Sequence, residues 1–387
     1  MNAKAIEVKQ EFVAIFQQQP LLVSSPGRVN IIGEHTDYND GFVLPAAINK
    51  SAYFAISLRA DNEIHLIAKD LNETYQTSIS NIKPDTKCNW PNYILGSIAQ
   101  FIKKGVTLKG FNVLFTSDIP IGAGLSSSAA IECATVYALN ELLQTNFDRV
   151  TMVKMAQAAE QEFTGVMCGI MDQFASMMGK KDHVIQLDCR SLEFQYVPFK
   201  LEGIKILLLN TNVKHALANS EYNTRRKECN QAVEWIKEHE NNIHSLRDVT
   251  LPMINEYVRP KNQLVANRSE FIVEEIQRLL DACNDLYHDN INELGKKMFE
   301  THRGLSELYE VSCKELDWLV NFVKHNNNVL GARMMGGGFG GCTINLVKEH
   351  AIDDLVDSIK INYEKQMGLP LSYYVATIED GTHIITE

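Results

Sequence analysis

Two glycines and three serines stand together in residues 120–130, which read PIGAGLSSSAA. A strand-like stretch at 111–117 precedes them and an apolar helical pattern follows. The first N–H groups of a helix lack partners within the helix, and the helix dipole adds positive potential there, so this pattern is typical of an anion site. Gly122 and Gly124 let the backbone approach a phosphate closely. Hydroxyls for a phosphate or a magnesium ion come from Ser126, Ser127 and Ser128.

Three other interpretations of this stretch are weaker. A helix N-cap needs one serine, not three behind two glycines. A Walker A loop needs a lysine after its last glycine, and none is present here. A dinucleotide-binding fingerprint would place a third glycine where Ser127 stands, and no second strand follows early enough. The stretch therefore predicts phosphate binding.

A second group of polar residues follows a buried-looking strand in residues 24–45, SSPGRVNIIGEHTDYNDGFVLP. A solvated hairpin turn explains Asn-Asp-Gly at 39–41. It does not explain Arg28 and Asn30 inside an apolar strand, because a buried arginine needs an acceptor. It also leaves out the acceptors that come next, which suit sugar hydroxyls or, with less support, a metal ion. These acceptors are Glu34, His35 and Asp37.

A third stretch, MMGGGFGGCTINLV at 334–347, carries five glycines within six positions. It formally fits GxGxxG, but a strand and not a helix follows it, which weakens a nucleotide-fold interpretation. The alternatives are a tight turn between a helix and a strand, or a backbone that lies flat against a ligand. The number of glycines favours the ligand-facing loop.

The elements that would carry these residues mix strands and helices without βαβα alternation, which indicates an α+β fold. Separate strands are expected at 21–33, 41–48 and 51–59, long helices fill most of 218–325, and a closing strand or hairpin occupies 372–387. A length of 387 residues favours two domains, placed at 1–200 and 201–387, with the last strand free to return to the first domain.

The composition excludes several classes of protein. The net charge of −11 argues against a general nucleic-acid binder, and no apolar run approaches the ~20 residues of a membrane span. The N-terminus shows no signal-peptide pattern. Eight scattered cysteines without a CxxC pair favour reduced thiols, and hence the cytoplasm, over a disulfide framework.

Together, the three stretches resemble the GHMP small-molecule kinase superfamily, and GRVNIIGEHTDYNDG resembles the signature of its galactokinases. MCGIMDQFAS at 167–176 and SEYNTRR at 220–226 are similar to further galactokinase segments. Met167 departs from this pattern where many relatives have proline, which leaves the chemistry untouched.

The resemblance implies a ribosomal S5-like N-terminal domain and a ferredoxin-like C-terminal domain with the active site in the cleft between them. It also implies magnesium-dependent transfer of phosphate from ATP to the anomeric hydroxyl of α-D-galactose. The product would be galactose 1-phosphate, in the first committed step of galactose catabolism.

The resemblance also implies a role for each site residue. Asp172 would accept or orient the sugar hydroxyl proton, and Arg28 beside it would favour the ionised carboxylate and stabilise the transferring phosphoryl group. Ser128 and Glu160 would bind magnesium. The nucleotide phosphates would lie on Gly122, Ala123, Gly124, Leu125, Ser126, Ser127 and Ser128. Galactose would be bound by Glu34, His35, Asp37, Gly169, Asp172 and Tyr222.

Without the resemblance, three of these residues have ordinary structural explanations. Glu160 fits a solvated helix face, Asp172 a helix cap, and Tyr222 an amphipathic helix. At the level of function, the alternatives are a kinase for N-acetylgalactosamine or arabinose, a non-catalytic galactose sensor, and a nicotinamide-dependent enzyme. The intact GLSSSAA argues against the sensor. A monomer is expected.

Overall fold

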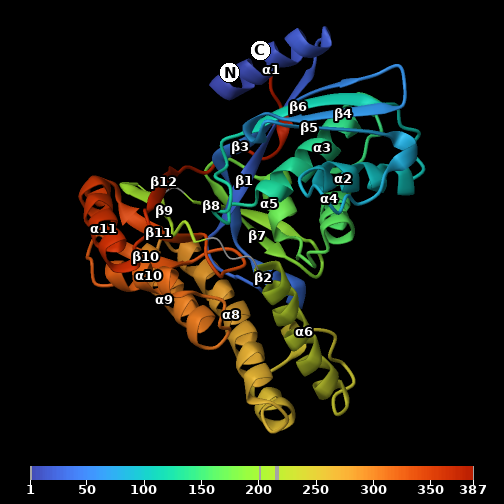
Figure 1. The fold of residues 1–387 in the computed structure, drawn as a ribbon. Helices are drawn as coiled ribbons and strands as arrows, with labels where there is room; N and C mark the ends of the chain where they lie inside the picture. Colours follow the sequence, from blue (N-terminus) through green and yellow to red (C-terminus); the bar gives the residue numbers. More distant parts are fainter. Residues whose placement is uncertain (1, 200–201, 214–217, 387) are drawn as a thin grey trace.

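The strands of the chain form three sheets, seen in a computed structural model that describes residues 2–199, 202–213 and 218–386 (Figure 1). The six-stranded sheet has the order β13 (His383–Ile384), β1 (Leu21–Asn30), β3 (Pro45–Leu58), β6 (Phe111–Ser117), β4 (Glu63–Ala68) and β5 (Glu73–Ser78). The four-stranded sheet has the order β10 (Val329–Met334), β11 (Cys342–Lys348), β9 (Ile204–Asn210) and β12 (Ser372–Ala376). The three-stranded sheet has the order β2 (Phe42–Val43), β7 (His183–Asp188) and β8 (Phe194–Pro198).

The helices of the first half are α1 (Ala3–Phe16), α2 (Pro91–Lys103), α3 (Ser127–Leu143), α4 (Arg149–Thr164) and α5 (Met171–Met178). Those of the second half are α6 (Ala218–Lys237), α7 (Leu251–Met253), α8 (Gln263–Tyr287), α9 (Ile291–Glu307), α10 (Lys314–Val323) and α11 (Ile352–Met367). Figure 1 shows α6 and α8 extending away from the sheets. The α+β class expected from the sequence is confirmed.

Several of these helices begin at residues whose side chains satisfy free backbone N–H groups. Asp148 accepts a hydrogen bond from the backbone N–H of Thr151 and starts α4, which ends at Gly165 with a φ of +75°. Asn262 accepts from Leu264 and Val265 at the start of α8. Such caps fix the ends of helices to within a residue and so fix what the helices carry.

The prediction of separate strands at 41–48 and 51–59 was wrong. β3 is one continuous strand from Pro45 to Leu58, and it pairs antiparallel with β1 along its length, apart from a register shift between Pro26 and Arg28. The polar residues Asn49 and Lys50 interrupt the apolar pattern in the middle of β3, because that part of the strand reaches the surface. A surface stretch of a strand is not necessarily a strand end.

The closing segment is not a hairpin. β12 pairs with β9 in the four-stranded sheet, whereas β13 pairs with β1 in the six-stranded sheet through Val23 and Ser24. The end of the chain therefore joins the sheets of the two halves. The domain limits at 1–200 and 201–387 stay a prediction.

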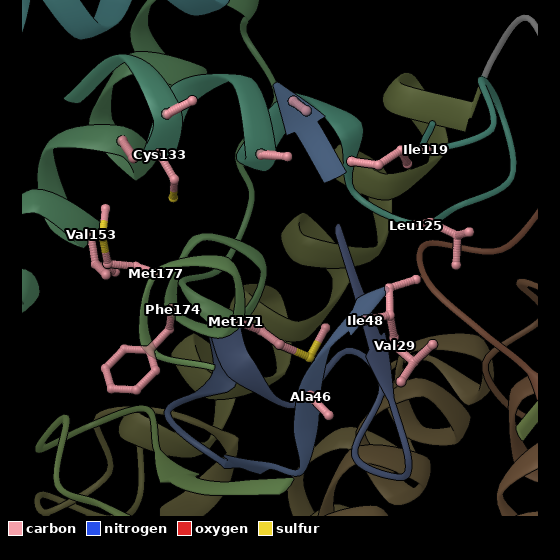
Figure 2. Packing of buried hydrophobic residues seen from close by; sticks show 14 of the residues in the cluster. Val29, Ala46, Ile48, Ile119, Leu125, Cys133, Val153, Met171, Phe174 and Met177 are labelled. Carbon is pink, nitrogen blue, oxygen red and sulfur yellow. The ribbon is translucent and has the colours of Figure 1, made fainter. Parts of the chain in front are cut away.

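The largest hydrophobic core lies between the six-stranded sheet and helices α2 to α5. Figure 2 shows part of it, where Val29 of β1 and Ile48 of β3 lie close to Met171 of α5. Phe174 of α5 is fully buried in the same cluster, which continues to Leu208 of β9. This packing fixes the start of α5, and thus Asp172, relative to β1.

Two further observations concern the chain as a whole. Within the described ranges, no helix combines the length and the apolar character that crossing a membrane would need. All eight cysteines are free thiols, four of them buried.

Candidate active site

One cavity of about 390 Å³ collects residues from both halves of the chain. Its walls come from the end of β1 and the loop after it, the loop before α3, the loop before α5, the helix α6, and the turn between β10 and β11. Of the residues predicted for the site, Ala123 alone does not line it, because its side chain points into the core and is fully buried. The others all line it: Arg28, Glu34, His35, Asp37, Gly122, Gly124, Leu125, Ser126, Ser127, Ser128, Glu160, Gly169, Asp172 and Tyr222.

The loop before α3 is held in a conformation that rules out the simple helix-cap explanation of its serines. Ser126 occupies the N-cap position with a φ of +59°, in the left-handed region that non-glycine residues rarely adopt. Its side chain makes no capping hydrogen bond and instead donates to Oδ2 of Asp172 at 2.5 Å. Such strain in a non-glycine residue is typical of functional loops.

Arg28 and Asp172 form a two-pronged ion pair at the centre of the cavity. Nε of Arg28 donates to Oδ1 of Asp172 at 2.7 Å, and Nη2 donates to Oδ2 at 2.9 Å. Nη1 donates to the carbonyl oxygen of Gly124 at 2.7 Å, so one guanidinium joins the acid to the serine loop. Burial alone would lower the pKa of Arg28, but the attraction of Asp172 and Glu34 raises it on balance. The arginine therefore remains a fixed positive charge.

The close approach of β1 to the serine loop depends on Gly27. The backbone N–H of Arg28 donates to the carbonyl oxygen of Leu125 at 3.1 Å. A Cβ on Gly27 would lie 2.5 Å from that same oxygen. No other residue fits there without moving one of the two segments.

Glu34 is fixed by an arginine from the second half of the chain. Nη2 of the fully buried Arg333 on β10 lies 3.1 Å from Oε1 of Glu34, and the backbone N–H of Gly336 donates to the same oxygen at 2.9 Å. Arg333 also donates to the carbonyl oxygens of Asn30 and Ile31. This arginine thus anchors the end of β1, and Oε2 of Glu34 receives no hydrogen bond from the residues that the structure describes.

Asp37 and Gly169 are in direct contact. A Cβ on Gly169 would lie 1.8 Å from Oδ2 of Asp37, so only glycine permits this carboxylate to sit where it does. Burial, the nearby charge of Asp172 and that of Glu34 raise the pKa of Asp37 to about 7, against hydrogen bonds from the backbone of Tyr38 and Met171. Asp37 is therefore an acceptor that gains or loses its proton near neutral pH.

His35 lies among three tyrosines, with ring centroids 5.8 Å from Tyr38, 5.4 Å from Tyr222 and 4.9 Å from Tyr309. Nδ1 shares a hydrogen bond of 2.7 Å with the Tyr38 hydroxyl, whereas Nε2 is buried without a partner among the described residues. Burial and the charge of Arg225 lower the pKa of His35 to about 3, although the nearby backbone of Gly337 opposes this shift, so the ring is neutral at pH 7. A buried, unpartnered ring nitrogen that lines a cavity is suited to a ligand hydroxyl.

Ser128 and Glu160 are the oxygen donors expected to hold magnesium. Burial and the charge of Asp172 raise the pKa of Glu160 to about 7, and hydrogen bonds to Ser128, Cys168 and Gln173 oppose this shift. Within the described part of the chain, no group of three His, Cys, Asp or Glu side chains could hold a metal. One hydroxyl and one carboxylate fit magnesium, which keeps few protein ligands and takes the remainder from phosphates and water.

The third glycine stretch connects two strands, β10 and β11, so the alternative of a turn between a helix and a strand is wrong. A Cβ on Gly338 would lie 2.1 Å from the carbonyl oxygen of Val311, and one on Gly341 would lie 3.3 Å from that of Ala123. Gly336, Gly337 and Gly338 line the cavity. The glycines therefore allow both exposure to a ligand and tight packing against neighbouring backbone, including the serine loop.

The structure also brings in residues that the sequence analysis missed. Arg333 lies in an apolar strand, and a buried arginine in such a strand was the signal already used for Arg28. Cys168 lines the cavity beside Gly169. Glu132 and Gln173 are fully buried close to Glu160, and no local pattern marks them. The role predicted for each site residue stays a prediction.

Comparisons with known proteins agree with this geometry. The galactokinase galactose-binding signature matches residues 10–58, the GHMP kinases N-terminal domain matches residues 92–180, and the GHMP kinases C-terminal domain matches residues 272–365. The chain is 42% identical to the galactokinase of Thermotoga maritima over 363 residues, which cover 94% of this chain and 99% of the relative. It is 43% identical to that of Clostridium acetobutylicum, with 92% of each chain covered.

Solved structures give the same answer. The galactokinase of Lactococcus lactis, crystallised with galactose, superposes with a TM-score of 0.94 at 32% identity over 98% of this chain and 99% of that one. A mevalonate kinase superposes with a TM-score of 0.65 at 21% identity, which shows the shared fold alone. The galactokinase signature covers β1 and the residues Glu34 and Asp37 that follow it, and relatives are more than 40% identical along nearly the whole chain. This protein therefore belongs to the galactokinase family of the GHMP kinases.

Proposed function

We propose that this chain transfers the γ-phosphoryl group of ATP to the anomeric hydroxyl of α-D-galactose and forms galactose 1-phosphate, the first committed step of galactose catabolism. The observation that carries the proposal is the single cavity in which Arg28 joins Asp172 to the serine loop. A phosphate on that loop and a sugar beside Asp172 would be neighbours. In-line phosphoryl transfer needs that arrangement and little covalent chemistry from the protein.

The sugar half of the cavity supplies acceptors of different kinds. Glu34 has one oxygen occupied by Arg333 and one available, and Asp37 is held against Gly169. The neutral ring of His35 offers Nε2, and Tyr222 stands over its ring. Sugar hydroxyls both donate and accept, so such a mixed set can fix each of them in one orientation.

The nucleotide half supplies backbone N–H groups and hydroxyls. Residues Gly122 to Ser128 would hold the phosphates, because the N-terminus of α3 attracts negative charge. Ser128 and Glu160 would hold Mg²⁺, which would supply positive charge to offset that of the phosphates. The raised pKa of Glu160 would fall when a cation binds, because the charged form is then stabilised.

The transfer itself would use Asp172 and Arg28. The anomeric oxygen bonds to the γ-phosphorus as the bond from that phosphorus to the β-bridging oxygen breaks, and ADP leaves. Asp172 accepts the hydroxyl proton or orients it. Among the described residues, Oδ1 of Asp172 accepts a single hydrogen bond, from Nε of Arg28, which leaves a lone pair for the sugar. Arg28 would stabilise the charge on the transferring group.

The proposal extends to how the protein works in the cell. The active unit is expected to be a monomer. Eight free thiols support a reducing compartment, the cytoplasm. Light scattering during size-exclusion chromatography would test the monomer, since a stable dimer would double the measured mass.

The direct test is ADP formation with galactose, N-acetylgalactosamine and arabinose under identical conditions. The proposal expects galactose to be turned over with the highest kcat/KM. A preference for either other sugar would make this chain a different sugar kinase. Tight binding of galactose and ATP without turnover would make it a sensor.

A further inference from the structure

Three helices that carry the nucleotide side of the site are tied together by one buried amide. Nε2 of Gln173 on α5 donates to Oε2 of Glu160 on α4 at 2.7 Å and to Oε2 of Glu132 on α3 at 3.0 Å. The side chains of Gln173 and Glu132 are fully buried. A bridge of this kind fixes three helices to one another at one point.

Each of these helices also carries a residue proposed for the reaction. Glu132 lies one turn after Ser128 on α3, Gln173 is the next residue after Asp172 on α5, and Glu160 is on α4. Residues four apart lie on the same face of a helix. The amide therefore links the two oxygen donors proposed for the metal to the acid proposed for the sugar.

Glu132 is a fully buried acid whose carboxyl group is only partly hydrogen-bonded among the described residues. Among the described residues, its carboxyl group accepts one hydrogen bond, from Gln173, and pairs with neither Lys nor Arg. Oε1 of Glu132 and Oε1 of Gln173 are both buried without a partner among those residues. Buried polar atoms without partners are costly, so each one in a native protein calls for an explanation.

We propose that Gln173, supported by Glu132, is a positioning residue that presents Glu160 to the magnesium ion of the nucleotide. By holding Oε2 of Glu160, the amide fixes the orientation of the carboxylate that would meet the cation. The inference rests on the proposed function, since it assumes that a divalent cation binds at Ser128 and Glu160. Groups that hold a metal ligand from behind typically change metal affinity 10–100-fold when they are removed.

The test measures cation binding directly. Mn²⁺, which replaces Mg²⁺ as a probe, is titrated into protein saturated with a non-hydrolysable ATP analogue, and free Mn²⁺ is followed by electron paramagnetic resonance. We expect Gln173→Leu to weaken Mn²⁺ binding at least about tenfold. Gln173→Asn should weaken Mn²⁺ binding in the same way, because the shorter asparagine side chain cannot reach both carboxyl groups. The KM for galactose should change less than about twofold in both variants.

Two substitutions at Glu132 show whether this residue acts as a hydrogen-bond acceptor for Gln173 or through its negative charge. Glu132→Gln keeps an oxygen that can accept from Gln173, so Mn²⁺ affinity should stay within about twofold of wild type. Glu132→Leu removes the acceptor and should weaken Mn²⁺ binding as Gln173→Leu does. Circular dichroism and thermal unfolding of each variant would show that the fold is retained.

Gln100→Leu is the matched control. Nε2 of Gln100 on α2 also donates to a glutamate of α4, Glu162, at 2.8 Å, but outside the cavity. This variant should bind Mn²⁺ as the wild type does. Wild-type Mn²⁺ affinity in folded Gln173→Leu or Gln173→Asn would overturn the inference, and so would an equal loss in Glu132→Gln and Glu132→Leu. Failure of the proposed function would appear separately, as a wild-type protein that binds Mn²⁺ with the analogue yet forms no ADP with galactose.

Discussion

Gly169→Ala should damage galactose binding while leaving ATP binding intact. The added Cβ would lie 1.8 Å from Oδ2 and 2.1 Å from Cγ of Asp37. Carbon and oxygen atoms that are not bonded do not approach so closely, so either the Asp37 carboxyl or the loop before α5 must move. Asp37 is itself buried among its neighbours, which leaves the carboxyl no alternative position that preserves its contacts.

The size of the effect follows from the hydrogen bonds that Asp37 would lose. A hydrogen bond to a charged group contributes about 1.5–3 kcal/mol. Loss of one such bond to a sugar hydroxyl corresponds to a roughly 10- to 150-fold rise in the KM for galactose. The KM for ATP should stay within about twofold, because the atoms nearest the new Cβ belong to Asp37 and not to the serine loop.

A double-mutant cycle with Asp37→Ala identifies the cause. Asp37→Ala removes the atoms with which the new Cβ collides, so Gly169→Ala should add nothing further in that background. Gly165→Ala controls for backbone strain on the same loop, since Gly165 has a φ of +75° and a Cβ there meets no atom within 4 Å. Steady-state kinetics with a coupled ADP assay give all the constants. Multiplicative effects of the two substitutions, or an unchanged KM for galactose in Gly169→Ala, would refute the reasoning.

Three other expectations follow from the same site. The KM for galactose should fall as the pH rises through about 7, because Asp37 then loses its proton and both its oxygens can accept hydrogen bonds. The same dependence of KM on pH in Asp37→Asn would contradict this assignment. Arg28→Lys should lower kcat about 10- to 100-fold at saturating substrates, since a lysine cannot reproduce the bonds from Nε and Nη2 to Asp172; an unchanged kcat would remove Arg28 from the transfer step. Arg333→Met should lower the free energy of unfolding by about 3–5 kcal/mol in urea titrations by leaving Glu34 buried without its cation, and Glu34→Gln should recover part of this loss in the double variant; a stable Arg333→Met protein would show that the contact between Arg333 and Glu34 does not stabilise the fold.

Much of the site could be predicted from local sequence. Arg28 stood out because a charge inside an apolar strand needs a partner, and in the structure that partner is Asp172. The serine loop stood out because its composition exceeds what a helix cap requires. Both signals come from residues whose types conflict with their surroundings.

The contacts across the fold could not be predicted in this way. Arg333 holds Glu34 from a strand 299 residues further along the chain, and no local pattern encodes that distance. The glutamine bridge joins three helices whose relative positions depend on how each packs against the sheet. The continuous β3 was missed because a strand that reaches the surface carries polar residues in its middle.

The central claim is that one cavity holds galactose beside Asp172 and the phosphates of ATP on the serine loop. A crystal structure with galactose, Mg²⁺ and a non-hydrolysable ATP analogue tests this directly. The account predicts the anomeric oxygen within hydrogen-bonding distance of Asp172 and in line with the γ-phosphorus above residues 122–128. Galactose bound outside the cavity, or phosphates bound away from the start of α3, would contradict it.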